Sequence, residues 1–313
     1  MLPPLRRQDL LADKLFRLLT LVCSLAVIGI VVFLLAQLWL ESSGTIHKFG
    51  AKFLSTNDWD PVNDQYGALP FLYGTLVTSA VALFISIPLG LGLAIFINEM
   101  CPLKLRPYVS FLTELLAAIP SVIYGLWAIF VLVPLMRDYF MPFCQRYFGW
   151  THLFGGAPYG IGLGTAGVVL SIMVLPLISS VSRDVMAAVP KHQREAALAL
   201  GATRWETIRM AIIGNSKSGI FGAIILGLGR ALGETMAVTM VIGNVPQVVK
   251  SLLAPGDTLA SVIANQFSEA TGDLYRSALI ELGLVLLLMT LVVNAIARLL
   301  VWYSVRTAGG ARA

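Results

Sequence analysis

The most constraining feature of this sequence is a set of long stretches that carry almost no charge. Residues 18–40 contain no Asp, Glu, Lys or Arg. An α-helix rises about 1.5 Å per residue, so about 20 apolar residues cross the roughly 30 Å hydrocarbon layer of a membrane. The run is also longer than the roughly 7–15 apolar residues of a secretory signal peptide. It therefore predicts a membrane-spanning helix.

Five further runs of the same kind lie at residues 67–98, 109–136, 160–181, 219–243 and 277–303. The whole chain is 57% hydrophobic and 12% charged, which is about half the charged share of an average soluble domain. Too little polar surface remains to cover a soluble globule of 313 residues. We therefore expect an all-α membrane protein with six transmembrane helices, and we exclude a soluble enzyme.

The basic residues predict how the helices are oriented. Lys and Arg accumulate in the cytoplasmic loops of membrane proteins. Placing the N-terminus inside puts most of the Lys and Arg residues on the cytoplasmic side. We therefore expect both termini in the cytoplasm. Contact of these residues with anionic membrane lipid accounts for the net charge of +5, so no nucleic-acid partner is needed to explain it.

The longest polar interval, residues 183–217, predicts two short helices on the cytoplasmic side. Pro190 suits the first turn of a helix, and Gly201 is typical of a helix end. Thr203 and Glu206 have the spacing of a capping box, which starts a second helix. We place Trp205, Ile208 and Ile212 on one face of that helix. An ordinary helical hairpin is one interpretation of this interval.

Two charged residues, Arg230 and Glu234, fall inside the fifth apolar run. An arginine near the centre of a membrane costs at least about 2.5–3.5 kcal/mol, and Glu234 at i+4 is positioned to offset this cost by pairing with it. The pair either fixes the register of the helix or lines a path for anions, since a guanidinium can hold an oxyanion with two donors. Gly229 and Gly233 would let another helix pack closely.

Glu114 and Glu281 lie nearer the ends of their runs, and we expect them to reach interfacial water or to pair with a neighbouring helix. The sequence has no Gly-x-x-x-x-Gly-Lys-Ser/Thr loop for nucleotide phosphates and no His-Glu-x-x-His motif. Its cysteines, Cys23, Cys101 and Cys144, are too far apart in sequence to suggest a metal site. We predict no catalytic residues, no metal and no cofactor bound by this chain. Energy for transport would come from a partner or from an ion gradient.

Two motifs resemble a known family. Glu195, Ala196 and Ala197, followed after three residues by Gly201, resemble the EAA loop of the inner-membrane permease subunits of ATP-binding-cassette (ABC) importers. The chain departs from that pattern at residues 211–214, where it lacks the final proline. The segment from Arg230 to Glu234, with residues 235–238 and 242–244, resembles the fifth span of phosphate-specific permeases. The stretches 59–62, 66–70, 73–79 and 114–124 resemble them as well, so the likeness covers residues 42–303.

The resemblance implies a type I ABC importer permease fold in a bacterial cytoplasmic (inner) membrane. It implies that Glu195, Ala196, Ala197 and Gly201 couple the chain to an ATPase. The implied partners are a PstA-like permease, an ATPase dimer that uses ATP and Mg²⁺, and a periplasmic or extracytoplasmic phosphate-binding protein. This chain would form half of the phosphate path. A secondary anion transporter and a structural or sensory membrane subunit are the alternatives.

We expect three parts along the chain. Residues 1–66 would hold a cytoplasmic segment, the first transmembrane helix and an outer loop. Residues 67–304 would form the permease core of five transmembrane helices, with the coupling loop at 183–217. Residues 305–313 would form a cytoplasmic tail.

Overall fold

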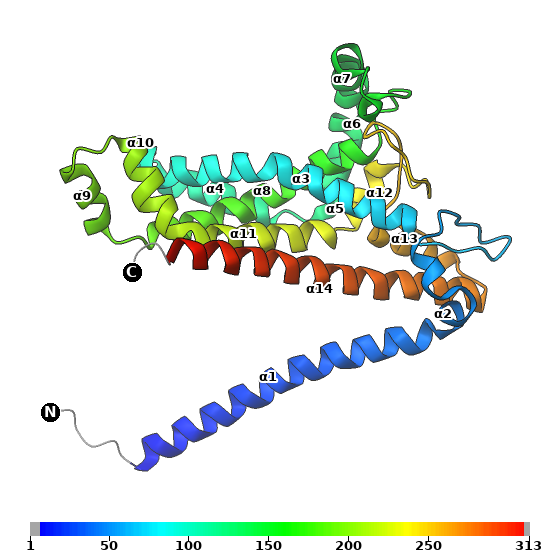
Figure 1. Ribbon diagram of the computed structural model, residues 1–313, viewed down its shortest axis with the longest axis horizontal. Helices are drawn as coiled ribbons and strands as arrows, with labels where there is room; N and C mark the ends of the chain where they lie inside the picture. The colour runs from blue at the N-terminus through cyan, green and yellow to red at the C-terminus, as the bar shows by residue number, and fades with distance from the viewer. Residues whose placement is uncertain (1–6, 310–313) are drawn as a thin grey trace.

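The computed structural model describes residues 7–309, and the regular structure of this part of the chain is helical (Figure 1). Six of its helices are long and apolar enough to cross a membrane, which confirms the predicted architecture. They are Asp13–Glu41, Leu69–Met100, Ser121–Phe148, Leu163–Ala187, Arg204–Leu232 and Asp273–Trp302. Of the predicted tail, residues 305–309 continue the last helix, and residues 310–313 lie outside the described part.

The first helix stands apart from the others. Helix α1 (Arg7–Glu41) leans away from the bundle and meets it only where it approaches α2 (Ser43–Phe49) and α14 (Asp273–Gly309) (Figure 1). At that junction Ser277 Oγ donates to the Glu41 carbonyl oxygen at 2.9 Å and lies 3.3 Å from Thr45 Oγ1. A short 3₁₀ helix, η1 (Gly50–Leu54), follows α2.

The core of the bundle is built from α3 (Leu69–Ile95), α8 (Leu163–Ala187) and α11 (Gly214–Leu232). Small residues bring these helices together. A Cβ added at Gly167 of α8 would lie 2.5 Å from Val81 of α3, and one at Gly219 of α11 would lie 2.3 Å from Val185 of α8. Backbones that approach this closely gain van der Waals contact, which is the main attraction between helices in a membrane.

The third crossing is not the single helix 109–136 that we expected. Helix α4 (Arg106–Ala118) ends first, and a second helix then runs through residues 121–148. Pro120 disfavours helical geometry at the residue before it, and Ile119 is extended at φ −66° and ψ 128°. The second helix comprises α5 (Ser121–Trp127), η3 (Ala128–Leu132), α6 (Val133–Leu135), η4 (Met136–Phe140) and α7 (Met141–Phe148).

The helix therefore continues through residues 137–148, beyond the end of the predicted run at residue 136. Arg137 and Asp138 are both exposed on this part of the helix and pair with each other at 2.7 Å. The end of this helix, α7, points away from the bundle (Figure 1). A short 3₁₀ helix, η5 (His152–Phe154), leads back to α8.

The fifth crossing also differs from the helix 219–243 that we expected. It begins earlier, with α10 (Arg204–Thr207) and the π-helical segment η6 (Ile208–Ile213), and passes into α11 at Gly214 without a break. It ends at Leu232, and after three non-helical residues α12 (Met236–Ile242) begins. Glycine has the lowest helix propensity of all residues except proline. The interruption at Gly233 is consistent with this.

The two ends of the bundle carry different structures. One end bears the short helix α9 (Lys191–Ala199), and the described ends of α1 and α14 point the same way (Figure 1). We call it the α9 end. The far end bears α13 (Leu259–Gln266) and η7 (Phe267–Glu269). There the loop 244–258 caps α8, since Leu163 and Gly164 donate their N–H groups to the Ala254 and Leu252 carbonyl oxygens.

Candidate functional site

Arg230 lies in the last turn of α11, on a face that no other helix covers within residues 7–309. The residue is exposed, as is Leu226 one turn earlier. A Cβ added at the neighbouring Gly229 would meet nothing within 4 Å. The close packing predicted for Gly229 and Gly233 therefore has no partner helix within the described residues. The glycine that does pack is Gly227, whose Cβ would lie 2.8 Å from Val174 of α8.

Glu234 does not sit one turn beyond Arg230 on a continuous helix. Because α11 ends at Leu232, Glu234 falls in the break before α12 and is half-buried. The two residues form no ion pair in the part of the chain that the structure describes. The expected i+4 pair was thus wrong, since it assumed helical geometry through Gly233.

The break between α11 and α12 restricts what can surround this part of the chain. A helix interruption at membrane depth leaves backbone N–H and C=O groups without helical partners, and it is tolerated only where protein or a water-filled cavity surrounds it. Beyond the break, polar groups continue along α12. Thr239 Oγ1 donates to the Thr235 carbonyl oxygen at 2.8 Å, and the exposed Asn244 donates to the Thr239 carbonyl oxygen at 3.1 Å. Polar side chains thus recur between Arg230 and Asn244.

A second broken crossing lies beside the first. Helix α5 packs on α12 so closely that a Cβ at Gly125 would lie 3.2 Å from the Ala237 Cα. The adjacent Tyr124 donates its hydroxyl to the Leu116 carbonyl oxygen of α4 at 2.8 Å, across the break at Pro120. The two interruptions and the arginine therefore belong to one region of the bundle.

The helix–turn–helix predicted for the coupling loop is present. Gly201 has a φ of +84°, a left-handed conformation that L side chains rarely adopt. The capping box is also formed: Thr203 Oγ1 accepts from the Glu206 N–H, and Glu206 accepts from the Thr203 N–H. Glu195, Ala196 and Gly201 are exposed, and Ala197 is half-buried. The loop is thus available to a partner at the α9 end.

The expected apolar face of the second short helix is only partly correct. Ile208 and Ile212 are buried, whereas Trp205 is 61% exposed. The turn widens to a π-helix from Ile208 onward, which changes the angle between Trp205 and the residues after it. Apolar side chains are left in the open at this end, with Leu200 90% exposed. An exposed leucine and tryptophan are typical of a protein contact.

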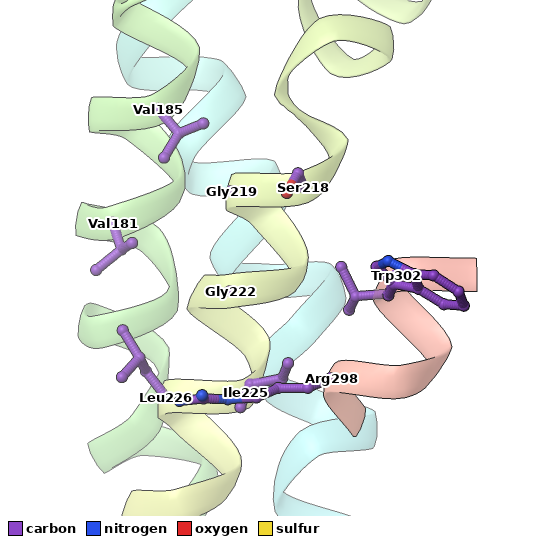
Figure 2. A pocket seen from close by; sticks show the side chains of 10 residues that line it. Val181, Val185, Ser218, Gly219, Gly222, Ile225, Leu226, Arg298 and Trp302 are labelled. Carbon is purple, nitrogen blue, oxygen red and sulfur yellow. The ribbon is translucent and has the colours of Figure 1, made fainter. Parts of the chain in front are cut away.

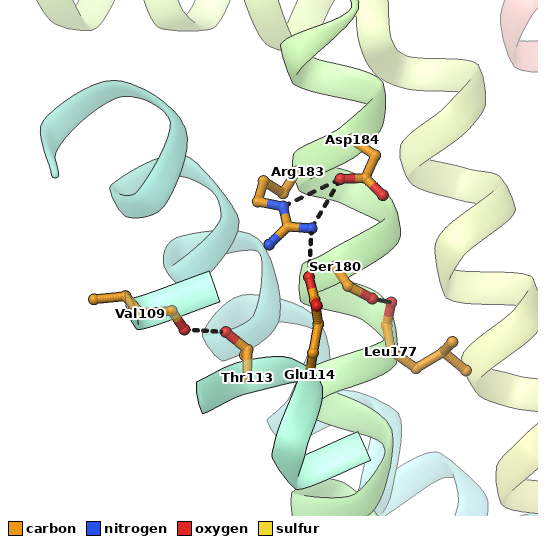
Figure 3. Close-up of polar contacts among 7 residues, drawn as sticks. All are labelled: Val109, Thr113, Glu114, Leu177, Ser180, Arg183 and Asp184. Atoms are coloured by element: carbon orange, nitrogen blue, oxygen red, sulfur yellow. Dashed lines mark hydrogen bonds and ion pairs between the residues drawn. The ribbon is translucent and has the colours of Figure 1, made fainter. Parts of the chain in front are cut away.

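Glu114 pairs with a neighbouring helix, as expected. Its Oε1 lies 3.1 Å from an Arg183 guanidinium nitrogen of α8, and the same nitrogen lies 3.0 Å from Asp184 (Figure 3). Glu281 is buried on α14 and forms no ion pair among the described residues, so it does not reach interfacial water as expected. Of these two carboxylates, Glu114 thus joins two helices.

Arg298 is a charged membrane residue that the sequence analysis did not single out. It lines an open groove of about 790 Å³ between α8, α11 and α14, together with Ser218 and Trp302. Its side chain reaches toward α11 beside Ile225 and Leu226 (Figure 2). A lone arginine within the long apolar run 277–303 was the available signal.

These features define a class of protein. The membrane bundle has two broken crossings side by side and an uncovered face of α11 that carries Arg230. An exposed helix–turn–helix lies at one end. This combination is typical of the membrane subunit of a transporter rather than of an enzyme. Residues 86–302 match the model of the binding-protein-dependent transport system inner membrane component. The chain belongs to this family of inner-membrane transport components.

Similar proteins with assigned names are transport permeases as well. A protein of Pasteurella multocida named phosphate transport system permease protein PstC is 47% identical over 92% of this chain and 91% of its own length. A PstC of Mesorhizobium japonicum is 44% identical over 93% of this chain and 90% of its own length. A probable PstC of Methanocaldococcus jannaschii is 37% identical over 90% and 91%.

Solved structures share the fold at low sequence identity. A bacterial ABC transporter involved in the import of alginate has a TM-score of 0.57 at 18% identity, covering 92% of this chain and 98% of that one. The MetNI methionine ABC transporter, in an inward-facing conformation, has a TM-score of 0.53 at 18% identity, covering 76% and 94%. The fold of this chain is that of an ABC importer permease.

Proposed function

We propose that this chain is the permease subunit of an ATP-driven, binding-protein-dependent phosphate importer and forms half of its translocation path. The observation that carries the proposal is the exposed Arg230 beside two helix breaks. A planar guanidinium presents two parallel donors to a tetrahedral oxyanion. The names of the relatives, with 37–47% identity, support phosphate as that oxyanion.

Glu234 belongs to the same path in this proposal. It is half-buried within the break, four residues beyond Arg230. Its carboxylate would attract Arg230 when no anion is present and repel an anion that binds. Both effects lower the affinity at the arginine, so that an anion held there is also released.

The uncovered surfaces indicate where partners would bind. A PstA-like permease would cover the open face of α11 around Leu226 and Gly229, completing the path. Each of two ATPase subunits would bind one permease, this one through Glu195, Ala196, Ala197 and the turn at Gly201. The ATPase would hold ATP and Mg²⁺, and a phosphate-binding protein would deliver its cargo at the far end.

The test is ATP-dependent uptake of labelled phosphate by the reconstituted four-component complex, with sulfate as competitor. We expect Arg230→Gln to lower uptake at least about tenfold, because a hydrogen-bonded charge is lost. Arg146→Gln, an exposed arginine on the projecting α7, is the matched control and should transport normally. Normal uptake by the assembled Arg230→Gln complex would refute the role of Arg230.

The same vesicles separate phosphate import from the alternatives. Uptake by this chain alone, driven by an ion gradient, would favour a secondary transporter. Uptake of sulfate in place of phosphate by the complete complex would identify a different oxyanion.

A further inference from the structure

Two contacts between polar side chains tie helix α9 to other helices: Asn215 of α11 donates to Gln193 at 2.8 Å, and Arg194 pairs with Glu99. None of its residues, Lys191–Ala199, is buried. Its two neighbours in sequence, α8 and α10, are joined to it through the backbone. Helix α3 is not, although its π-helical end η2 (Phe96–Met100) lies at the same end of the bundle. Any force that passes from α9 to α3 therefore needs a side-chain connection.

Arg194 provides this connection. Its Nη1 lies 3.0 Å from Oε1 of Glu99 in η2, and its Nη2 donates to the Met186 carbonyl oxygen of α8 at 2.9 Å. The side chains of Arg194 and Glu99 are 24% and 16% exposed, so water screens the pair less than a surface pair. Among the described residues it is the one ion pair that joins α9 to another helix.

Glu99 is itself held in place at the corner between α3 and α4. Asn98 donates its side-chain amide to Glu99 Oε1 at 2.7 Å. Arg106, the first residue of α4, donates to the Asn98 carbonyl oxygen. A displacement of Glu99 would therefore be transmitted to this corner as a whole.

The surroundings of the pair leave few other connections between α9 and α3. A cleft of about 600 Å³ lies between them, lined by Glu99 and Arg194 and by the apolar side chains of Met100, Leu198 and Trp205. Met100, Leu198 and Trp205 are all exposed. Close apolar packing between α9 and the end of α3 is thus absent from the described structure, and the ion pair bridges an open space.

We infer that Arg194 and Glu99 are positioning residues that carry the displacement of α9 to α3. The inference rests on the proposed function, in which an ATPase docks at α9. Movement of α9 would then reach α8 and α11 through the backbone and α3 through the ion pair. Helix α3 packs along α8 at Gly90 and Gly167. If α8 moved with α9 and α3 did not, these two packed helices would be pulled apart.

The experiment measures phosphate taken up per ATP hydrolysed by the reconstituted four-component complex. We expect Glu99→Gln and Arg194→Gln each to lower this ratio about fivefold, a typical coupling effect, while ATP hydrolysis continues. The charge swap Glu99→Arg with Arg194→Glu should recover a large part of the ratio. Arg194→Lys keeps the charge and should lower the ratio less than Arg194→Gln.

Glu114→Gln is the matched control. It removes the ion pair between Glu114 and Arg183, which lies at the same end of α8 but does not involve α9. Its coupling ratio should stay at the wild-type value. Failure of the wild-type complex to import phosphate would refute the proposed function. Wild-type import together with a normal ratio in Glu99→Gln would refute only the present inference, as would an equal loss in Glu114→Gln. If the single variants do not assemble, a charge swap that assembles but stays uncoupled also refutes it.

Discussion

Gly74 of α3 lies against the carbonyl oxygen of Asp257, so that a Cβ atom at Gly74 would be 1.9 Å from that oxygen. The contact joins the first third of α3 to the buried start of α13. Thr75 strengthens the same junction, since its Oγ1 accepts the Leu259 N–H at 3.0 Å.

We therefore predict that Gly74→Ala destabilises the bundle by about 3 kcal/mol or more, since the clash is with backbone and cannot be relieved by a rotamer change. Thermal unfolding in detergent measures the effect. Gly92→Ala is the control on the same helix, because nothing lies within 4 Å of that position, and it should be neutral or slightly stabilising. Equal stability of the two variants would contradict the packing described at Gly74.

Asp257 predicts a dependence of stability on pH. Burial raises the pKa of its carboxyl from 3.8 to about 7. The folded protein then holds a proton that the unfolded chain has lost, so the free energy of unfolding falls as the pH rises from about 4 to about 7. The difference of about three pKa units corresponds to at most about 4 kcal/mol.

Asp257→Asn should remove most of this slope and leave the variant more stable than the wild type at neutral pH. Unfolding midpoints measured between pH 4.5 and 8 test this, with the exposed Asp58→Asn as a control that keeps the slope. Parallel curves for wild type and Asp257→Asn would show that Asp257 is not the group that titrates.

Gln266 is predicted to fix the outer loop. Its Oε1 accepts hydrogen bonds from Trp59 Nε1 and from the Tyr275 hydroxyl, both at 2.8 Å. Gln266→Leu leaves both donors without this acceptor, and we expect a loss of about 1–3 kcal/mol. Gln266→Glu retains an acceptor and should cost less. Tryptophan fluorescence during unfolding follows the region directly, and equal stability of both variants would contradict the role of Gln266.

Gly201 is predicted to matter for coupling more than for folding. A β-branched residue at its φ of +84° is strained, so Gly201→Val should distort the turn that presents α9 to the ATPase. We expect ATP hydrolysis to persist while phosphate uptake falls several-fold. Gly201→Asn tolerates the left-handed conformation and should transport nearly normally. Normal transport by Gly201→Val in proteoliposomes would rule out this coupling role.

The number of crossings was predictable because a charge-free run of about 20 residues has few alternatives in water or lipid. The capping box at Thr203 and the turn at Gly201 were predictable because their signals are local. The helix end at Gly233 was missed, since an apolar run looks the same whether one helix or two cross it. The continuation of the helix through Arg137 and Asp138 was not predicted, because two charges after an apolar run look the same in sequence whether the helix ends there or continues.

The pairing of Arg194 with Glu99 could not be predicted from the sequence. The two residues are separated by two membrane crossings, and each alone resembles an ordinary charge of a cytoplasmic loop. Arg230 was found because a charge inside an apolar run is costly, but its relation to Glu234 depended on the local backbone. The sequence thus indicated which charged residues are costly to place in the membrane, but the partners of these residues depend on the tertiary structure.

Helix α1 has a consequence for how the protein is assembled. Between Asp13 and Glu41 only Leu35 and Leu38 are partly covered, and no residue is buried. The core formed by α3, α8 and α11 therefore closes without the first crossing. Nearly the whole apolar circumference of α1 must be covered by lipid or by another subunit. This helix therefore offers a contact surface to neighbouring molecules and does not add to the packed core.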